Sequence, residues 1–73
     1  MIKKIDVNVQ DIGKEEKGFF RAIIEAEIEP NHVLTVSDCG RGAARSIAFA
    51  MKKFGDTVLK MYPEYPEQKE TKP

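Results

Sequence analysis

The sequence predicts a small α+β protein, in which a three-stranded antiparallel sheet (strand–strand–strand–helix) carries one C-terminal amphipathic helix on one face. Two observations support this prediction. Apolar and polar residues alternate with a period of two in the first half of the chain, and from Ala43 the apolar spacing lengthens to three or four residues. With 73 residues, the chain is expected to form one domain over residues 1–62, followed by a disordered, proline-rich and charged tail at 63–73.

The first strand is expected over roughly residues 2–10, where Ile5, Val7 and Val9 alternate with polar residues. This pattern is typical of a half-buried strand. The polar run 11–18 contains two glycines, and we interpret it as a hairpin loop.

Residues 19–29 are open to two interpretations. Apolar residues occupy every second position from 20 to 28, as in a strand, but every fourth residue of the run is large and apolar, as in a helix. We favour a strand because five consecutive alternations are hard to produce by accident and the flanking turns fit a hairpin. The other face of this strand carries Phe19 and Ile23, which a single helix would leave uncovered and available to another chain.

A turn at 30–32 leads to a short β-branched strand, 33–36, and then to a loop at 37–42. The helix that follows has an apolar stripe expected to lie on the sheet, made of Ile47, Met51, Phe54, Val58 and Met61. Gly55-Asp56 weakens the middle of this helix and predicts a kink or a split there, since Asp56 is suited to capping a new start. Pro63 ends the helix.

The composition excludes several classes of protein. No apolar run approaches the ~18 residues of a membrane span, and the first residues are too polar for a secretory signal. A single cysteine cannot form an internal disulfide, which indicates a reducing, cytoplasmic setting. The net charge is zero, so a bulk attraction to nucleic acid is absent, although residues 40–60 carry five cations and one carboxylate.

The stretch 37–46 carries the strongest functional signal, because glycines precede a helix start that has two arginines close by. Unpaired N–H groups at a helix start attract anions. Along the outer side of the predicted helix, an aromatic ring lies among cations, and we expect it either to anchor a partner or to pack on the first loop or the tail tyrosines. The candidate binding residues are Gly40, Arg41, Gly42, Arg45, Phe49, Lys52 and Lys53.

No catalytic or metal-binding residue and no cofactor is predicted. His32 lies in a turn without a second histidine or a cysteine at metal-ligand spacing. The carboxylates at 25, 27 and 29 share a strand face but lack a liganding loop, so we interpret them as solvated.

Cys39 and Arg45 are separated by five residues and followed by Ser46, a spacing that resembles the phosphate-binding loop of the protein tyrosine phosphatases. The resemblance implies a thiolate nucleophile with a phosphate-holding arginine. It covers eight residues, and Asp38 stands where that family has a histidine.

Gly40, Gly42, Arg45 and Ala48, with the strands before and the helix after them, resemble the C-terminal half of double-stranded-RNA-binding domains over roughly residues 19–60. The resemblance implies contact between first-turn cations and phosphates across a groove. The family's Lys-Lys pair is replaced here by Arg45-Ser46, and its first helix by a strand.

Together these patterns predict a non-enzymatic binding module, a protein-interaction adaptor or inhibitor in the style of phage and mobile-element proteins such as the anti-CRISPR proteins. The basic helix face and the preceding loop would contact the partner. The alternatives are a nucleic-acid-binding domain and, more remotely, a cysteine phosphatase. A chain of this size is compatible with a monomer or a homodimer.

Overall fold

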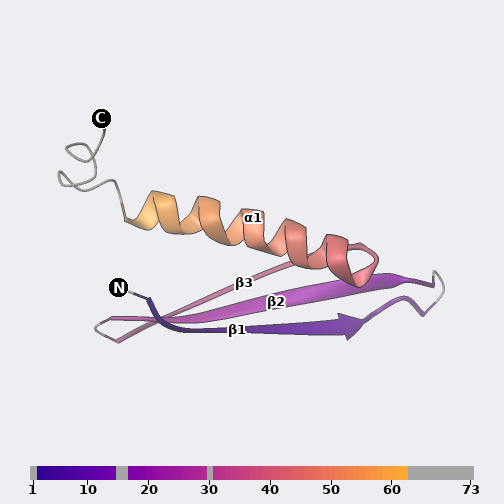
Figure 1. The fold of residues 1–73 in the computed structure, drawn as a ribbon, viewed down its shortest axis with the longest axis horizontal. Helices are drawn as coiled ribbons and strands as arrows, with labels where there is room; N and C mark the ends of the chain where they lie inside the picture. The colour runs from indigo at the N-terminus through magenta and orange to yellow at the C-terminus, as the bar shows by residue number, and fades with distance from the viewer. Residues whose placement is uncertain (1, 15–16, 30, 63–73) are drawn as a thin grey trace.

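The computed structural model describes residues 2–14, 17–29 and 31–62. Three strands, β1 (Ile2–Asp11), β2 (Phe19–Ile28) and β3 (His32–Arg41), form an antiparallel sheet in the order β1-β2-β3. The helix α1 (Ala43–Met61) lies on one face of this sheet (Figure 1). The predicted α+β fold class is confirmed. The disordered tail predicted at 63–73 lies outside the described residues.

The strand assignment of residues 19–29 is also confirmed, and the central position of β2 explains its burial. Every second residue of β2 from Ala22 to Ile28 is buried, and these side chains lie beneath α1. The register places Val7 of β1 and Val36 of β3 on either side of Ile24, so the three side chains share the helix-covered face. Phe19 and Ile23 belong to the opposite face, as predicted, and both are half-buried.

The helix packs along part of the predicted stripe, since Ile47 and Phe54 are partly buried against the core of the sheet. Its buried residues are Ser46 and Ala50, whereas Met51, a member of the stripe, is 53% exposed. Small side chains at the contact let the helix backbone approach the sheet closely, which turns the larger apolar residues to the sides. The buried Ser46 hydroxyl donates a hydrogen bond to the Ala43 carbonyl at 2.8 Å, so this polar group is paired.

The loop predicted at 37–42 is wrong, because β3 continues to Arg41 in register with Phe19 of β2. Pairing with β2 outweighs the local turn preference of its glycine and aspartate residues. Gly42 alone joins strand to helix. It has φ 95°, and its N–H donates to the Gly18 carbonyl at 2.6 Å.

The predicted kink at Gly55 is wrong as well, since α1 runs unbroken from Ala43 to Met61. Two interactions span this point. The Lys52 ammonium lies 3.3 Å from the Asp56 carboxylate, and the Thr57 hydroxyl donates to the Lys53 carbonyl at 2.8 Å. Asp56 therefore forms an i,i+4 pair inside one helix and does not cap a second one.

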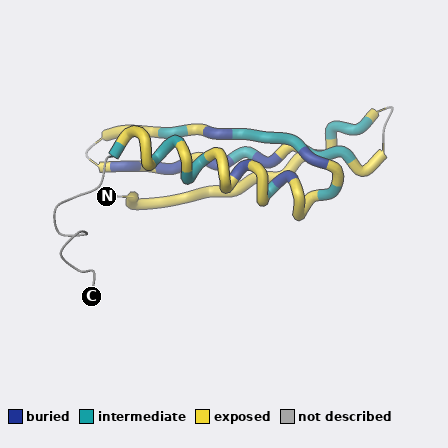
Figure 2. The backbone as a smooth tube through the Cα atoms, turned by 90° about the horizontal axis from the view of Figure 1, so that it is seen from above, coloured by how far each residue is buried: buried dark blue, intermediate teal, exposed yellow. Residues whose placement is uncertain are grey.

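The helix covers only part of the sheet. It packs on β3 and β2 and barely touches β1. Figure 2 shows the result: all ten residues of β1 are exposed, although the alternation predicted a half-buried strand. A helix is about 10 Å wide and strands are about 4.8 Å apart, so one helix covers about two strands.

Candidate interaction surfaces

The predicted basic face lies on the side of α1 that borders β3, and its aromatic residue is part of the fold. The Phe49 ring packs on Gly40 of β3, where an added Cβ would lie 3.1 Å from Phe49 Cδ2 and 3.1 Å from the Ser46 backbone nitrogen. The Arg45 guanidinium lies 5.1 Å from the centroid of the same ring, within range of a cation–π interaction. Phe49 is nevertheless 38% exposed. The structure thus brings Gly40, Arg45 and Phe49 together.

The lysines predicted for this face already have partners within the chain. Lys53 Nζ donates to the Ser37 carbonyl of β3 at 3.2 Å, and Lys52 is paired with Asp56. Arg41 ends β3, next to Gly42 at the start of the helix. Of the seven predicted residues, Gly40, Phe49 and Lys53 hold α1 against β3, Arg45 lies over Phe49, and Lys52 is paired within the helix.

The phosphatase resemblance does not extend to three dimensions. Cys39 is a strand residue, opposite Arg21 on the sheet face that turns away from α1. Arg45 lies on α1, on the other side of the sheet. Because residues 39–41 belong to β3, a phosphate-binding loop between Cys39 and Arg45 is not formed.

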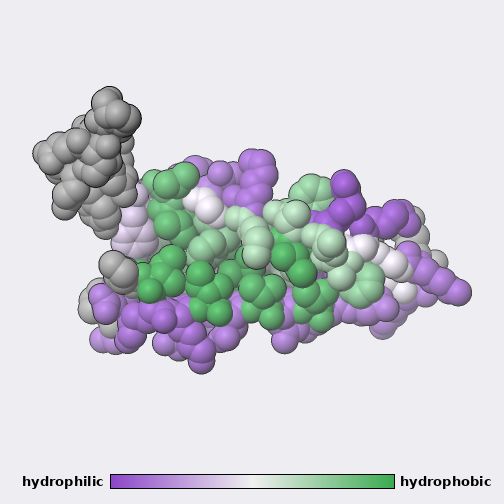
Figure 3. Space-filling model, viewed as in Figure 1, coloured by the Kyte–Doolittle hydropathy of each residue, from purple (hydrophilic) through white to green (hydrophobic). Residues whose placement is uncertain are grey.

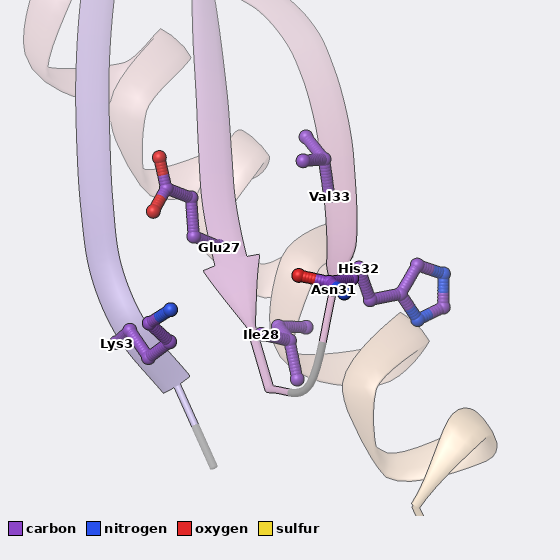
Figure 4. Close-up of a pocket in the computed structure, with 6 residues that line it drawn as sticks. All are labelled: Lys3, Glu27, Ile28, Asn31, His32 and Val33. Carbon is purple, nitrogen blue, oxygen red and sulfur yellow. The ribbon is translucent and has the colours of Figure 1, made fainter.

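The described residues form no metal-ligand cluster, and the pocket in Figure 4 is small. No group of three or more His, Cys, Asp or Glu side chains there is placed to hold a metal ion. The pocket in Figure 4 has a volume of about 210 Å³, is lined by residues that include Lys3, Glu27 and His32, and has the His32 ring pointing away from the other labelled side chains. Small-molecule sites are usually about 300–1,000 Å³. In the described part of the chain, no helix is long and apolar enough to cross a bilayer.

A second surface, which the sequence interpretation missed, lies along β1. Ile5, Val7 and Val9 pair with Ala26, Ile24 and Ala22, all of which are buried under α1. The three β1 side chains therefore point to the helix side of the sheet, yet they are 48%, 43% and 37% exposed, in that order.

The flank of α1 above β1 is apolar too. Phe49 and Lys53 contact β3, so at about 100° per residue the opposite flank of the helix faces β1. This flank carries no charged residue and consists of Ala44, Ile47, Met51, Gly55 and Val58. We call Ile5, Val7 and Val9 together with this flank the β1–α1 shelf. Figure 3, viewed from the β1 side, shows it as a band of apolar surface along the molecule.

One sequence signal could have revealed the shelf. The strand at 2–10 and the strand at 19–29 both have a continuous apolar face, while only one helix is available to cover the sheet. Because one helix is wide enough to cover about two strands, a three-stranded sheet has one edge strand that the helix does not cover.

Comparison with known proteins gives no indication of the function. No protein-family model, curated protein or solved structure matches the chain.

Proposed function

We propose that this protein is a non-enzymatic protein-binding module, an adaptor or inhibitor, and that its partner docks on the β1–α1 shelf. The observation that carries the proposal is the exposure of Ile5, Val7 and Val9 beside an uncharged helix flank. Contiguous apolar surface on a small protein is typical of a protein contact site. The partner is expected to present an apolar strip that completes the layer above the sheet.

The basic side of α1 has a supporting role in this proposal. Its cations lie on the flank away from β1, where they steer an acidic partner towards the protein without being buried at the contact. Phe49 stabilises the packing of α1 on β3 and is not the main anchor, because its ring is already in contact with Gly40.

The test uses the full chain as bait, with bound proteins identified by mass spectrometry. Met51→Lys places a charge on the exposed part of the shelf and is expected to abolish capture of a partner. Lys52→Gln, at the neighbouring position on the charged side of the helix, is the matched control and should retain it. A partner that survives Met51→Lys but is lost in an Arg45→Ala variant would overturn the shelf as the docking site.

Nucleic-acid binding is the second candidate, favoured by one observation. The first turn of α1 has no side-chain cap at Gly42, and this turn carries Arg45. Against it, Arg45 stacks on Phe49 and the two lysines are paired within the chain. Fluorescence anisotropy with duplex RNA, duplex DNA and single strands separates the candidates. Saturable binding that weakens steeply with salt and disappears in the Arg41→Ala, Arg45→Ala variant would favour nucleic acid.

A further inference from the structure

The backbone edges of the two outer strands differ in how they are protected. On β3, Lys53 donates to the Ser37 carbonyl at 3.2 Å, and the Cys39 N–H donates to the Asp38 side chain at 2.8 Å. Ser37 and Cys39 are two residues apart, so the N–H and C=O groups of both residues point to the same side of the strand. Side chains thus occupy backbone groups that an edge strand leaves without a strand partner.

In the described part of the chain, the edge of β1 has no such side-chain hydrogen bonds to its backbone. Its ten residues, Ile2–Asp11, contain no proline or glycine, and no side chain is bonded to its backbone groups. The one irregularity is a register shift between Ile2 and Lys4, at the far end of the strand. Proteins usually block such an edge, because an open strand pairs readily with another strand.

We propose that a second copy of this chain occupies this edge, with the two β1 strands paired antiparallel about a two-fold axis. The result is a continuous six-stranded sheet. The pairing uses the backbone edge of β1, whereas the shelf uses its helix-side face, so the two proposals concern different groups of the same strand.

The charges along β1 select the second copy and the antiparallel direction. Lysines occupy positions 3 and 4, with the Asp6 carboxylate 3.8 Å from the Lys4 ammonium, and an aspartate occupies position 11. One end of the strand is therefore net basic and the other acidic. Antiparallel pairing places the basic end of one copy beside the acidic end of the other. Parallel pairing would place like charges side by side, which is unfavourable.

The order of charged and apolar residues along β1 also favours a register centred on Val7. With Val7 opposite Val7 of the second copy, Ile5 lies opposite Val9 and Lys3 opposite Asp11, so apolar residues meet apolar ones across the new ladder. A register centred on Asp6 would set two carboxylates directly opposite each other.

The two-fold axis has a consequence for the shelf. Both helices lie on the same side of the six-stranded sheet, and their axes are about four strand spacings apart, roughly 19 Å. Packed helices are about 8–10 Å apart. The dimer therefore joins two shelves into one apolar floor and leaves it open to a further partner.

The small hydrophobic core of one chain favours dimerisation. Only six apolar residues of the described chain are buried: Ala22, Ile24, Ala26, Ile28, Val36 and Ala50. A domain of this size buries little apolar surface to offset the conformational entropy lost on folding, and many small domains are stabilised by association.

The first test is sedimentation equilibrium of the full chain from about 1 µM to several hundred micromolar, a range that covers the usual affinities of transient homodimers. A concentration-dependent dimer mass is expected. A monomer throughout this range overturns the proposal, and the β1 edge would then be available to a strand of a different protein.

The register is tested by cross-linking in a Cys39→Ser background. Val7→Cys places two thiols opposite each other at the two-fold axis, within disulfide range, and oxidation is expected to convert most of the chain to a covalent dimer. Asn8→Cys, which faces the other side of the sheet, is the matched control and should cross-link at least several-fold less. Equal cross-linking of both variants, or preferential cross-linking of Asn8→Cys, overturns the proposal.

A second pair of variants serves if Val7→Cys fails to fold. Ile5→Cys and Val9→Cys chains should form a covalent dimer when mixed, and much less when either is oxidised alone, because position 5 faces position 9 of the other copy. Equal yields in the mixed and single samples would contradict the register. Partner capture by the shelf is measured separately, so failure here does not decide the proposed function.

Discussion

β1 and β3 both form an edge of the sheet and both pair with β2, yet they lie in different environments. β3 packs beneath α1, its Gly40 contacts the Phe49 ring, and its Ser37 carbonyl is bonded to Lys53. β1 is exposed along its whole length. The contrast arises because the helix follows β3 through a single residue, Gly42, and therefore returns over the strand it has just left. We expect stability to be concentrated on the β3 side and binding on the β1 side.

The first comparison is between two residues on opposite flanks of α1. Phe49→Ala removes a ring that is 38% exposed and packs on β3, and should lower the free energy of unfolding by about 2 kcal/mol, below the 3–5 kcal/mol of a fully buried Phe. Met51→Ala, on the flank above β1, should cost less than about 1 kcal/mol. Urea unfolding of both variants measures the difference. Equal losses would show that the helix is anchored on both sides.

The two valines that flank Ile24 provide the next comparison. Val36 on β3 is 7% exposed, and truncation to alanine should cost about 2 kcal/mol through lost burial and the cavity left behind. Val7 on β1 pairs with the same isoleucine but is exposed, so Val7→Ala should cost about 0.5 kcal/mol in the monomer. Thermal unfolding at low protein concentration checks both values. A Val7 loss as large as that of Val36 would mean that β1 is covered in solution.

The glycines allow a comparison in which the sign of the effect differs. Gly40→Ala brings a Cβ to 3.1 Å from the Phe49 ring and the Ser46 nitrogen, and is expected to destabilise the fold by about 1–2 kcal/mol. Gly55→Ala meets nothing within 4 Å and replaces a helix-interior glycine, so it should stabilise by about 0.5–1 kcal/mol. Denaturation midpoints that shift in the same direction would argue against close packing of α1 on β3.

The sequence predicted the fold because its strongest patterns are local. Alternation identified the strands at 2–10 and 19–29, and the longer apolar period identified the helix. The length of β3 and the continuity of α1 were missed, since pairing with β2 and the interactions across Gly55 outweigh the preferences of the individual residues.

The site was harder to predict, because it depends on where the helix lies on the sheet. The predicted basic face exists, but Phe49 is held by Gly40 and Lys53 by Ser37, contacts that cross between elements. The shelf arises from the opposite cause, a strand that no other element reaches. Its residues were visible in the sequence as a half-buried pattern, but the absence of their cover was not.

The smallest expected change in stability sharpens the comparison most. Lys53→Met removes the hydrogen bond to the Ser37 carbonyl while keeping the aliphatic part of the side chain, and should cost less than about 0.5 kcal/mol because the bond is exposed. It also leaves part of the β3 edge as open as β1, so association is expected to rise, as sedimentation at high concentration would show. Lys52→Met, which leaves that bond intact, controls for the lost charge. Unchanged association in Lys53→Met would mean that cover by α1, and not this lysine, keeps the β3 edge closed.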